Sequence, residues 1–428
     1  MRALALAGVL AAGCGGTAAV IDLDLTTAPG SPLLDQVQHL RLALTLPPKV
    51  VEADRGPDGF DLALEVDASG ITGALIVEGF DAGGALIACG QSPPFPVAAL
   101  NAHIVVYMAP PMSIAAAPEP LAAAARNGVS AGVLDFGAIF AGGVDDAGAP
   151  SDAIAVYNAY DHTLGPGLAM PEPRSELQVG IGIAGAVFLY GGFDAAHAAT
   201  ATYERFDTNV APAGAYTDLG DGVAARAGER AVTVGTNHFL VTGSPVLDLQ
   251  LDVVTQRTDI VTLPRAGASA FSDGGTVSAI FAGAEGITRF QNNAFASLSP
   301  TPRVAADAAT LTDNRVVVAG GGMSTTDLAT DILIVDAGPG TVTSIAAALV
   351  TPRANPTVAA TPRHIVVAGG VDATGAPIMD AEVIDMRTFT HVATIPYTNT
   401  APLAVALPDD QVLLEDAGTL QLFTPPPP

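Results

Sequence analysis

The feature that most constrains this chain is a short apolar run ending in a glycine doublet, which recurs along most of its length. Four copies keep both glycines, two keep one glycine, and one keeps neither. The first glycine, or the residue that replaces it, stands at positions 142, 191, 243, 283, 320, 369 and 416. The spacing of 37 to 52 residues follows from these positions. Repeats of this length built from short strands are typical of propeller blades.

Each repeat carries similar signals around its doublet. Three doublets are followed by an apolar residue and then Asp145, Asp194 or Asp372. Glycine followed by Asp predicts a tight turn, because glycine accepts positive φ and Asp bonds to the nearby backbone. A further apolar strand, a polar turn, a Pro-Arg pair and an alanine- and valine-rich strand come next. Four short strands without helical periodicity predict one four-stranded antiparallel sheet per repeat.

This pattern resembles the kelch-repeat family, whose propellers share a superfamily with the central domain of galactose oxidase. The resemblance covers residues 110–428 and rests on the doublets, on strands that end in Asp336, Asp385 or Tyr157, and on the Pro-Arg step. The chain departs from the family in having no Trp. The resemblance implies an all-β fold with a seven-bladed kelch-type β-propeller. A six-bladed propeller is the alternative if the weak third and fourth repeats form one blade.

The ends of the repeat region predict how the propeller closes. The last repeat stops after 420–423, one strand short of a blade. Residues 113–117 have the sequence Ser-Ile-Ala-Ala-Ala, which recurs at 344–348 in the outer part of a blade. We therefore expect the segment before the first doublet to complete the last blade.

The N-terminus predicts a secretion signal. Residues 1–13 combine Arg2, a short apolar run and small residues, and Cys14 follows directly. This order resembles a bacterial lipoprotein signal, which implies that Cys14 is acylated and becomes the new N-terminus. We expect a tether over 14–21 and a protein anchored by lipid at the outer membrane or cell surface, outside the cytoplasm. An ordinary secretory peptide with an unrelated Cys is the alternative.

Residues 22–109 predict a separate unit. Short alternating runs are separated there by Pro, Gly and Asp clusters, which favours a small immunoglobulin-like β-sandwich. Cys89 stands in one of these runs, and we expect it to be a buried hydrophobe without reactivity. The propeller is expected over 110–428.

Composition narrows the classes of partner. The chain has 43 acidic and 17 basic residues, giving a formal charge of −26. This charge argues against binding to nucleic acid or electrostatic binding to anionic lipid. Expected partners are a protein or glycan on the loop face of the propeller, and the membrane through the lipid on Cys14.

Motifs for catalysis are few. Galactose oxidase chemistry, as the resemblance implies it, needs copper held by Tyr and His and a Tyr cross-linked to Cys, but Cys89 lies outside the repeats. The His residues lack paired metal-ligand spacing, and Gly128–Gly132 matches a nucleophile elbow in the wrong context. The acidic groups at 145–146 and 218–221 favour turns over a calcium site. No catalytic residue, metal site or cofactor is therefore expected.

One recurrent residue could bind a ligand. An arginine occupies the same place in five repeats: Arg174, Arg226, Arg265, Arg303 and Arg353. A fixed guanidinium at this place favours a structural link between blades through carbonyls or turn carboxylates. The alternative is a positive ring that binds carboxylate or sulfate groups. We expect a non-enzymatic binding or scaffolding protein; the alternative is a kelch-like propeller enzyme acting on an acidic sugar.

Overall fold

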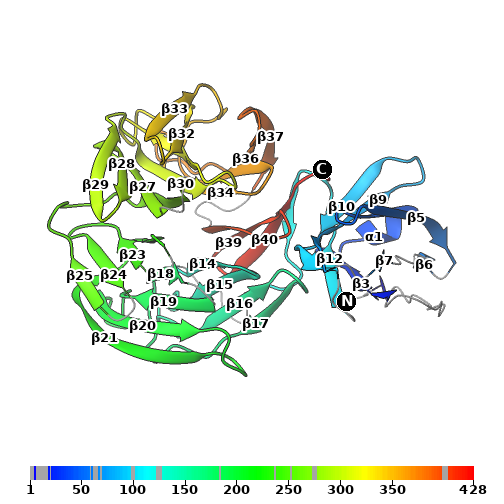
Figure 1. Ribbon diagram of the computed structural model, residues 1–428, viewed down its shortest axis with the longest axis horizontal. Helices are drawn as coiled ribbons and strands as arrows, with labels where there is room; N and C mark the ends of the chain where they lie inside the picture. The colour runs from blue at the N-terminus through cyan, green and yellow to red at the C-terminus, as the bar shows by residue number, and fades with distance from the viewer. Residues whose placement is uncertain are drawn as a thin grey trace.

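The computed structural model describes residues 4–5, 18–19, 21–57, 59–60, 66–67, 70–97, 102–121, 128–182, 185–235, 238–250, 253–271, 277–397 and 403–428. Seven four-stranded antiparallel sheets form a propeller, and a smaller β-unit lies beside it (Figure 1). This arrangement confirms the all-β propeller fold that the repeats predict. Within these described ranges, no helix is long and apolar enough to cross a membrane.

The seven sheets follow one another along the chain. From the innermost strand outward, the first three are β14 (Ser130–Leu134), β15 (Gly137–Ala141), β16 (Ile154–Asn158) and β17 (Thr163–Pro166); β18 (Gln178–Ile181), β19 (Ala186–Tyr190), β20 (Thr200–Asp207) and β21 (Ala215–Arg226); and β22 (Ala231–Thr233), β23 (His238–Val241), β24 (Leu247–Gln250) and β25 (Val253–Gln256). The next three are β26 (Ala266–Phe271), β27 (Val277–Gly283), β28 (Gly286–Gln291) and β29 (Ala294–Ser299); β30 (Val304–Thr310), β31 (Val316–Gly322), β32 (Ile332–Asp336) and β33 (Thr341–Ile345); and β34 (Thr357–Ala360), β35 (His364–Ala368), β36 (Asp380–Asp385) and β37 (His391–Pro396). The seventh sheet contains β38 (Leu403–Ala406), β39 (Val412–Asp416), β40 (Thr419–Thr424) and β13 (Ser113–Ala116).

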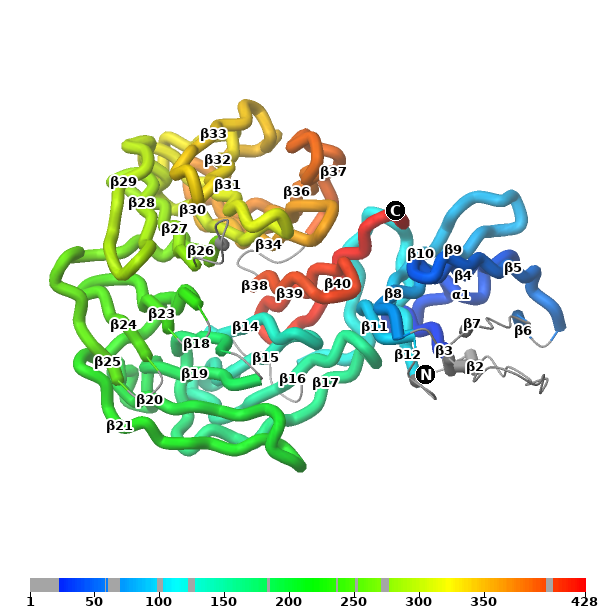
Figure 2. Tube along the Cα trace, viewed as in Figure 1, coloured from blue at the N-terminus to red at the C-terminus, as the bar shows by residue number. Residues whose placement is uncertain are grey.

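The seventh sheet joins the two ends of the repeat region. Strand β13 pairs with β40 in antiparallel register, with Ile114 opposite Phe423. The innermost strands contact one another in turn around the ring, and β38 contacts both β34 and β14. The ring therefore closes through a strand that precedes the first doublet, as the sequence predicts (Figure 2).

The glycine doublets explain why neighbouring sheets approach so closely. Gly142 has a φ of 65°, and a Cβ at this position would lie 2.2 Å from the carbonyl oxygen of Arg174. The amide of Gly143 donates to that same carbonyl at 3.1 Å. Gly321 repeats this bond to the carbonyl of Arg353 at 2.7 Å. A doublet thus ties its sheet to the connection that enters the next one.

The second strands of the sheets are buried on both faces. Every residue of β15, β31 and β35 is buried, because a neighbouring sheet covers each side. Apart from His364 at the start of β35, these strands contain no polar side chain, whereas the outermost strand β33 has only exposed and partly buried positions. The apolar runs before the doublets are therefore the cores between sheets.

The smaller unit has two main sheets around one core. One sheet has the order β1 (Leu4–Ala5), β3 (Ile21–Thr26) and β12 (Ala102–Tyr107), and the other has the order β10 (Leu86–Gln91), β9 (Leu75–Phe80), β4 (His39–Leu44), β5 (Lys49–Gly56) and β6 (Gly59–Phe60). The remaining elements are β2 (Ala18–Ala19), β7 (Val66–Asp67), β8 (Thr72–Gly73), β11 (Phe95–Pro96) and α1 (Leu33–Gln36). Leu25, Leu42, Val77 and Val106 meet in the core between the two main sheets. This is the layered arrangement expected of a β-sandwich.

Candidate functional site

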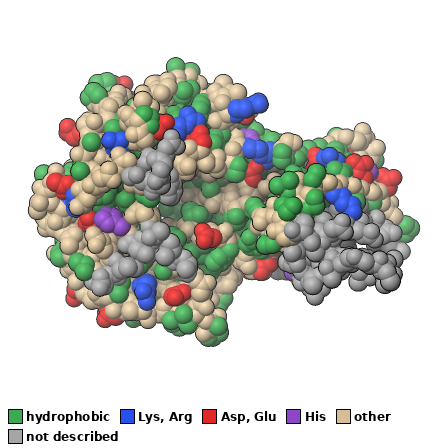
Figure 3. Space-filling view, viewed as in Figure 1, with side chains coloured by type: hydrophobic (Ala, Val, Ile, Leu, Met, Phe, Trp, Pro, Cys, Tyr) green, Lys and Arg blue, Asp and Glu red, His purple; other side chains and the backbone are tan. Residues whose placement is uncertain are grey.

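A cavity of about 430 Å³ opens at the centre of the propeller, on the face where the innermost strands begin. Figure 3 shows the propeller hollowed at the middle of the ring. All seven sheets contribute to its wall. Its polar and charged lining includes Ser130, Glu176, Glu229, Arg230, Arg265, Asp307, Glu415 and Asp416.

Arg353 shows what most of the recurrent arginines do. Its fully buried guanidinium donates to the carbonyl of Gly369 at 3.1 Å, to Asp380 at 2.7 Å and to Glu382 at 2.6 Å. All three partners belong to the sheet that Arg353 enters. The side chain therefore links the connection between sheets to the third strand of its own sheet.

Three other recurrent arginines are bound in related ways. Arg174 is buried, donates to the carbonyl of Gly191 at 2.9 Å and pairs with Glu204 in β20. Burial lowers the pKa of Arg174, and the nearby Glu204 carboxylate opposes this effect. Arg303 pairs with Asp331 at 2.6 Å.

Arg226 donates to two carbonyls, those of Ala225 and Pro245. Four of the five recurrent arginines are therefore structural links: Arg174, Arg226, Arg303 and Arg353. None of these four lines the central cavity.

Arg265 differs from the other four. Its side chain is exposed in the central cavity and makes no hydrogen bond or ion pair with any described residue. Burial by the pocket walls and the neighbouring Arg230 guanidinium lower the pKa of Arg265, while Asp307, Glu229 and Glu176 oppose the shift. An arginine stays protonated at neutral pH, so Arg265 is an open cation inside a pocket.

The register of the sheets explains why Arg265 is open. Glu204 stands opposite Leu189, and Glu382 stands opposite Val367, each two residues before the first glycine of the doublet. The equivalent position in the fourth sheet, opposite Phe281, holds Thr288. Thr288 has no charge to pair with a guanidinium. The fifth sheet has Leu333 at this position, and Arg303 pairs instead with Asp331, just before β32. Strand β28 has no acid at either place, since its sequence is Gly-Ile-Thr-Arg-Phe-Gln. The lack of any acid in β28 is the sequence signal that would have separated Arg265 from the buried arginines.

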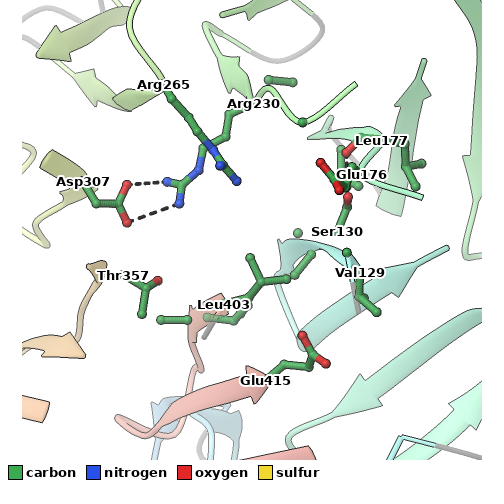
Figure 4. A pocket seen from close by; sticks show the side chains of 18 of the residues that line it. Val129, Ser130, Glu176, Leu177, Arg230, Arg265, Asp307, Thr357, Leu403 and Glu415 are labelled. Carbon is green, nitrogen blue, oxygen red and sulfur yellow. Dashed lines mark hydrogen bonds and ion pairs between the residues drawn. The ribbon is translucent and has the colours of Figure 1, made fainter. Parts of the chain in front are cut away.

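A second arginine, Arg230, lies beside Arg265 and is not one of the five recurrent positions. Its guanidinium donates to the two carboxylate oxygens of Asp307 at 2.5 Å and 3.3 Å (Figure 4). Asp307 also accepts the amide of Val358 at 2.9 Å. The ion pair therefore connects β30 and β34 with the residue just before β22. The signal for this pair is Asp307 itself, a charged residue in the alanine-rich strand Val304–Thr310.

Carboxylates make up the rest of the charged lining. Glu176 is exposed in the pocket, and its side chain has no hydrogen-bond partner among the described residues. Its backbone is fixed, since its amide donates to the carbonyl of Gly128 at 2.8 Å and its carbonyl accepts the amide of Gly228 at 2.9 Å. Glu229 accepts the hydroxyl of Thr242 at 2.7 Å.

Glu415 is the buried member of the acidic lining. It is 3% exposed and accepts the amide of Gly418 at 2.8 Å. Asp416 follows it at the end of β39. Among these carboxylates, Glu176 is the one whose side chain faces the pocket most freely, and Figure 4 places it across the cavity from Arg265.

Other candidates from the sequence have structural roles. Ser130 begins β14 and donates its hydroxyl to the carbonyl of Leu177 at 2.6 Å, so it lies in a strand and not at a strand–helix elbow. Asp145 accepts the amides of Ala147 and Ala149 at 2.9 Å each, which is turn chemistry. Burial raises the pKa of the Cys89 thiol to about 12, as expected for an inert cysteine. Cys14 lies outside the described residues.

Comparison with known proteins identifies a fold. No protein-family model and no curated protein sequence matches the chain. A solved structure of a fungal alcohol oxidase of the AA5 family, in complex with copper, is similar to 73% of this chain over 76% of its own length. The TM-score is 0.52 and the sequence identity is 14%. This likeness supports the galactose-oxidase-like, kelch-like propeller that the repeats predict.

This comparison corrects one expectation. We expected a protein that is not an enzyme, and the comparison contradicts this expectation, because a solved structure similar to the chain is an alcohol oxidase. The physical reason is that the missing residues exclude one chemistry, that of a copper site with a cross-linked Tyr and Cys. They do not exclude other reactions in the same central cavity.

The residues of the central cavity do not fit copper. Copper sites in proteins are built mainly from imidazole and sulfur ligands. The lining residues include no His, Cys or Tyr. Over the described part of the chain, no group of three or more His, Cys, Asp or Glu residues could hold a metal ion. The pocket offers guanidinium and carboxylate groups, which suit binding of an acidic ligand and transfer of protons.

Proposed function

We propose that this chain is a kelch-like propeller enzyme that acts on an acidic sugar in its central cavity. The observation that carries the proposal is the guanidinium of Arg265, open to the pocket and without a partner among the described residues. A buried or half-enclosed arginine without a carboxylate is a ready site for a carboxylate or sulfate group. A guanidinium can bind such a group through two parallel hydrogen bonds.

In this proposal Arg265 fixes the acidic group, and Glu176 faces the sugar ring. Glu176 is the exposed carboxylate on the opposite wall (Figure 4), so it is placed to accept a proton from a sugar hydroxyl or to return one. Glu229 and Asp307 favour the charged form of Arg265. The reaction class is therefore proton transfer on a sugar held by its acidic group.

We also propose that the propeller is presented outside the cytoplasm at the outer membrane or cell surface, through a lipid on Cys14. The support is the order of the first fourteen residues, in which a short apolar run and small residues precede the cysteine. In this proposal processing removes the edge strand β1 and leaves β3 paired with β12. An acidic sugar at the end of a glycan chain could reach the open face of such an anchored propeller.

The test combines binding and turnover. Glucuronate, galacturonate and sialic acid are added to the purified protein, binding is measured by calorimetry, and conversion is followed by proton NMR. We expect Arg265→Gln to reduce binding at least tenfold. We expect Glu176→Gln to keep binding and lose turnover. The matched control is Arg387→Gln, an exposed arginine outside the pocket-lining residues.

Two results would contradict the proposal. One is that none of the three acidic sugars binds. The other is that they bind equally well to the Arg265→Gln variant, which would place the site elsewhere. Binding through Arg265 without conversion of any sugar would reject the catalytic part of the proposal.

A further inference from the structure

The central cavity is lined by more carboxylates than arginines, and this imbalance determines how many negative charges a bound acid can carry. Two arginines, Arg230 and Arg265, line the pocket with five carboxylates. Asp307 already binds Arg230 through both of its oxygens. The pocket therefore offers one free guanidinium among the described residues, surrounded by carboxylates.

We propose that the pocket selects ligands that carry a single negative charge and rejects those that carry two. This inference rests on the proposed function, because it assumes that Arg265 binds the acidic group of a sugar. A carboxylate or a sulfate ester carries one charge, which Arg265 can neutralise. A phosphate monoester carries nearly two at neutral pH, and its second charge meets no second open cation.

The carboxylates around Arg265 make this second charge unfavourable. Glu176, Glu229 and Asp307 line the same cavity as Arg265, and their charges favour its protonated form. Like charges inside one cavity repel more strongly than in bulk water, since the walls lower the effective dielectric constant. The same carboxylates accept hydrogen bonds, so they favour a ligand whose remaining groups are hydroxyls.

Asp307 is the residue that pairs with the second arginine, Arg230, and so keeps it from binding a ligand. Its side chain is 4% exposed, and its carboxylate also accepts the amide of Val358, so it is fixed in place. While Asp307 is charged, Arg230 is neutralised within the protein. Removing this charge should give the pocket a second open guanidinium.

The experiment uses three derivatives of one sugar. Glucuronate, glucose 6-sulfate and glucose 6-phosphate are titrated into the purified protein at pH 7.5, with glucose as the neutral reference. We expect glucuronate and glucose 6-sulfate to bind with Kd values within about fivefold of each other. We expect glucose 6-phosphate to bind at least tenfold more weakly than glucuronate. The sulfate ester separates charge from shape, because it is tetrahedral like phosphate but singly charged.

Two variants test the cause of the selectivity. Asp307→Asn frees Arg230 and is expected to tighten glucose 6-phosphate binding at least tenfold. Glu176→Gln removes a carboxylate from an exposed position and is expected to tighten glucose 6-phosphate binding about threefold. This second variant replaces Asp307→Asn in the test if Asp307→Asn does not fold. The matched control is Glu285→Gln, an exposed acid in the turn between β27 and β28 on the same face.

Each outcome has a defined meaning. If glucose 6-phosphate binds wild-type protein as tightly as glucuronate, the charge selectivity is wrong while the proposed binding of acidic sugars stands. If the wild-type protein prefers glucuronate but neither variant reduces the difference between the Kd values for glucuronate and glucose 6-phosphate, these carboxylates are not the cause of the selectivity. If none of the three acidic probes binds, both the inference and the proposed function fall.

Discussion

The carboxylate of Asp307 holds the guanidinium of Arg230 by two hydrogen bonds, at 2.5 Å and 3.3 Å, across the wall of the central cavity. The two residues belong to different sheets that are not neighbours in the ring, because β26 stands between β22 and β30. The pair therefore links two sheets that are not neighbours across the central cavity. Among the described residues, Arg265 is left as the cation that is open to the cavity.

The buried and the open arginines should differ sharply in their effect on stability. Arg353→Ala leaves the fully buried Glu382 without its charged partner, and loss of one member of a buried pair costs about 3–5 kcal/mol. Arg265→Ala removes a side chain that has no partner among the described residues. Its effect on the free energy of unfolding should stay within about 0.5 kcal/mol. Urea unfolding followed by circular dichroism measures both.

Arg387→Ala is the control for this comparison, because Arg387 is exposed on a hairpin of the same sheet as Arg353. A loss of less than about 1 kcal/mol in Arg353→Ala would contradict its role as a structural link. A large loss in Arg265→Ala would show that this side chain also supports the fold.

The architecture could be predicted because it depends on local, repeated chemistry. The doublets at Gly142 and Gly320 adopt positive φ, and the apolar runs before them fill the cores between sheets. Closure by residues 113–116 could be predicted because the last repeat lacks one strand and a matching segment stands before the first doublet. These signals need no knowledge of distant contacts.

The site could be predicted only in part, because it depends on which residues meet across the ring. Arg265 was among the predicted ligand-binding residues, but the sequence alone placed it with Arg174 and Arg353. The distinction comes from another strand, β28, which contains no acid that could pair with Arg265. Arg230 and Asp307 are 77 residues apart, and no repeat position links them. Pairs of this kind are visible only once the ring is closed.

The closing strand should determine the stability of the whole propeller. Two shortened chains are compared, one beginning at residue 109 and one at residue 118. Both lack the smaller unit, but only the first keeps β13, whose pairing with β40 is flanked by the bonds Met112 N–Thr424 O at 2.9 Å and Ala117 N–Leu420 O at 3.0 Å. Each lost backbone bond costs on the order of 1 kcal/mol, so the shorter chain should lose several kcal/mol.

The shorter chain should also aggregate, because β40 becomes an unpaired edge that can bind the same edge in another molecule. Thermal unfolding and light scattering on the two chains test this directly. Equal stability and equal solubility would contradict a closing role for β13.

The lipid anchor is testable by one substitution. If the thiol of Cys14 receives the lipid, Cys14→Ala should move the protein from the membrane fraction to the soluble fraction outside the cytoplasm, since the acyl chains provide the attachment. Fractionation followed by immunoblotting measures the distribution, and Cys89→Ala is the matched control. Unchanged membrane attachment of Cys14→Ala would reject the anchor.

The last prediction concerns pH and a buried cluster where the smaller unit meets the first and seventh sheets. His162 lies there between Tyr107, Tyr157 and Asp409, with all four side chains buried. The amide of Tyr107 donates to Nε2 of His162 at 3.3 Å, so the ring proton is assigned to Nδ1, which lies 2.8 Å from the hydroxyl of Tyr157. Asp409 Oδ2 lies 3.7 Å from Nε2. The geometry indicates a neutral histidine beside a carboxyl group.

Burial shifts the two titrating groups in ways that favour their neutral forms. It lowers the pKa of His162 to about 4, against a small opposing effect of Asp161. It raises the pKa of Asp409 to about 8, with the charge of Asp410 adding to the rise. Asp410 itself is paired with Arg363 at 2.6 Å. Each shift makes the stability of the fold depend on pH, with opposite sign.

The signs define a window for measurement. Between pH 4 and 6.5, His162 is protonated in the unfolded chain but neutral in the folded protein, so its contribution to stability increases as pH rises. In the same range Asp409 is protonated in the folded protein but ionised in the unfolded chain, so its contribution decreases as pH rises. The two effects therefore oppose each other. Between pH 6.5 and 8, Asp409 is the one of these two groups that contributes. The free energy of unfolding should therefore fall as pH rises through this range, by at most about 1.4 kcal/mol per pH unit from this group. Asp409→Asn cannot ionise and should remove the fall, whereas Asp313→Asn, an exposed acid, should leave it in place. A wild-type protein whose stability is flat between pH 6.5 and 8 would show that Asp409 is already ionised in the folded state.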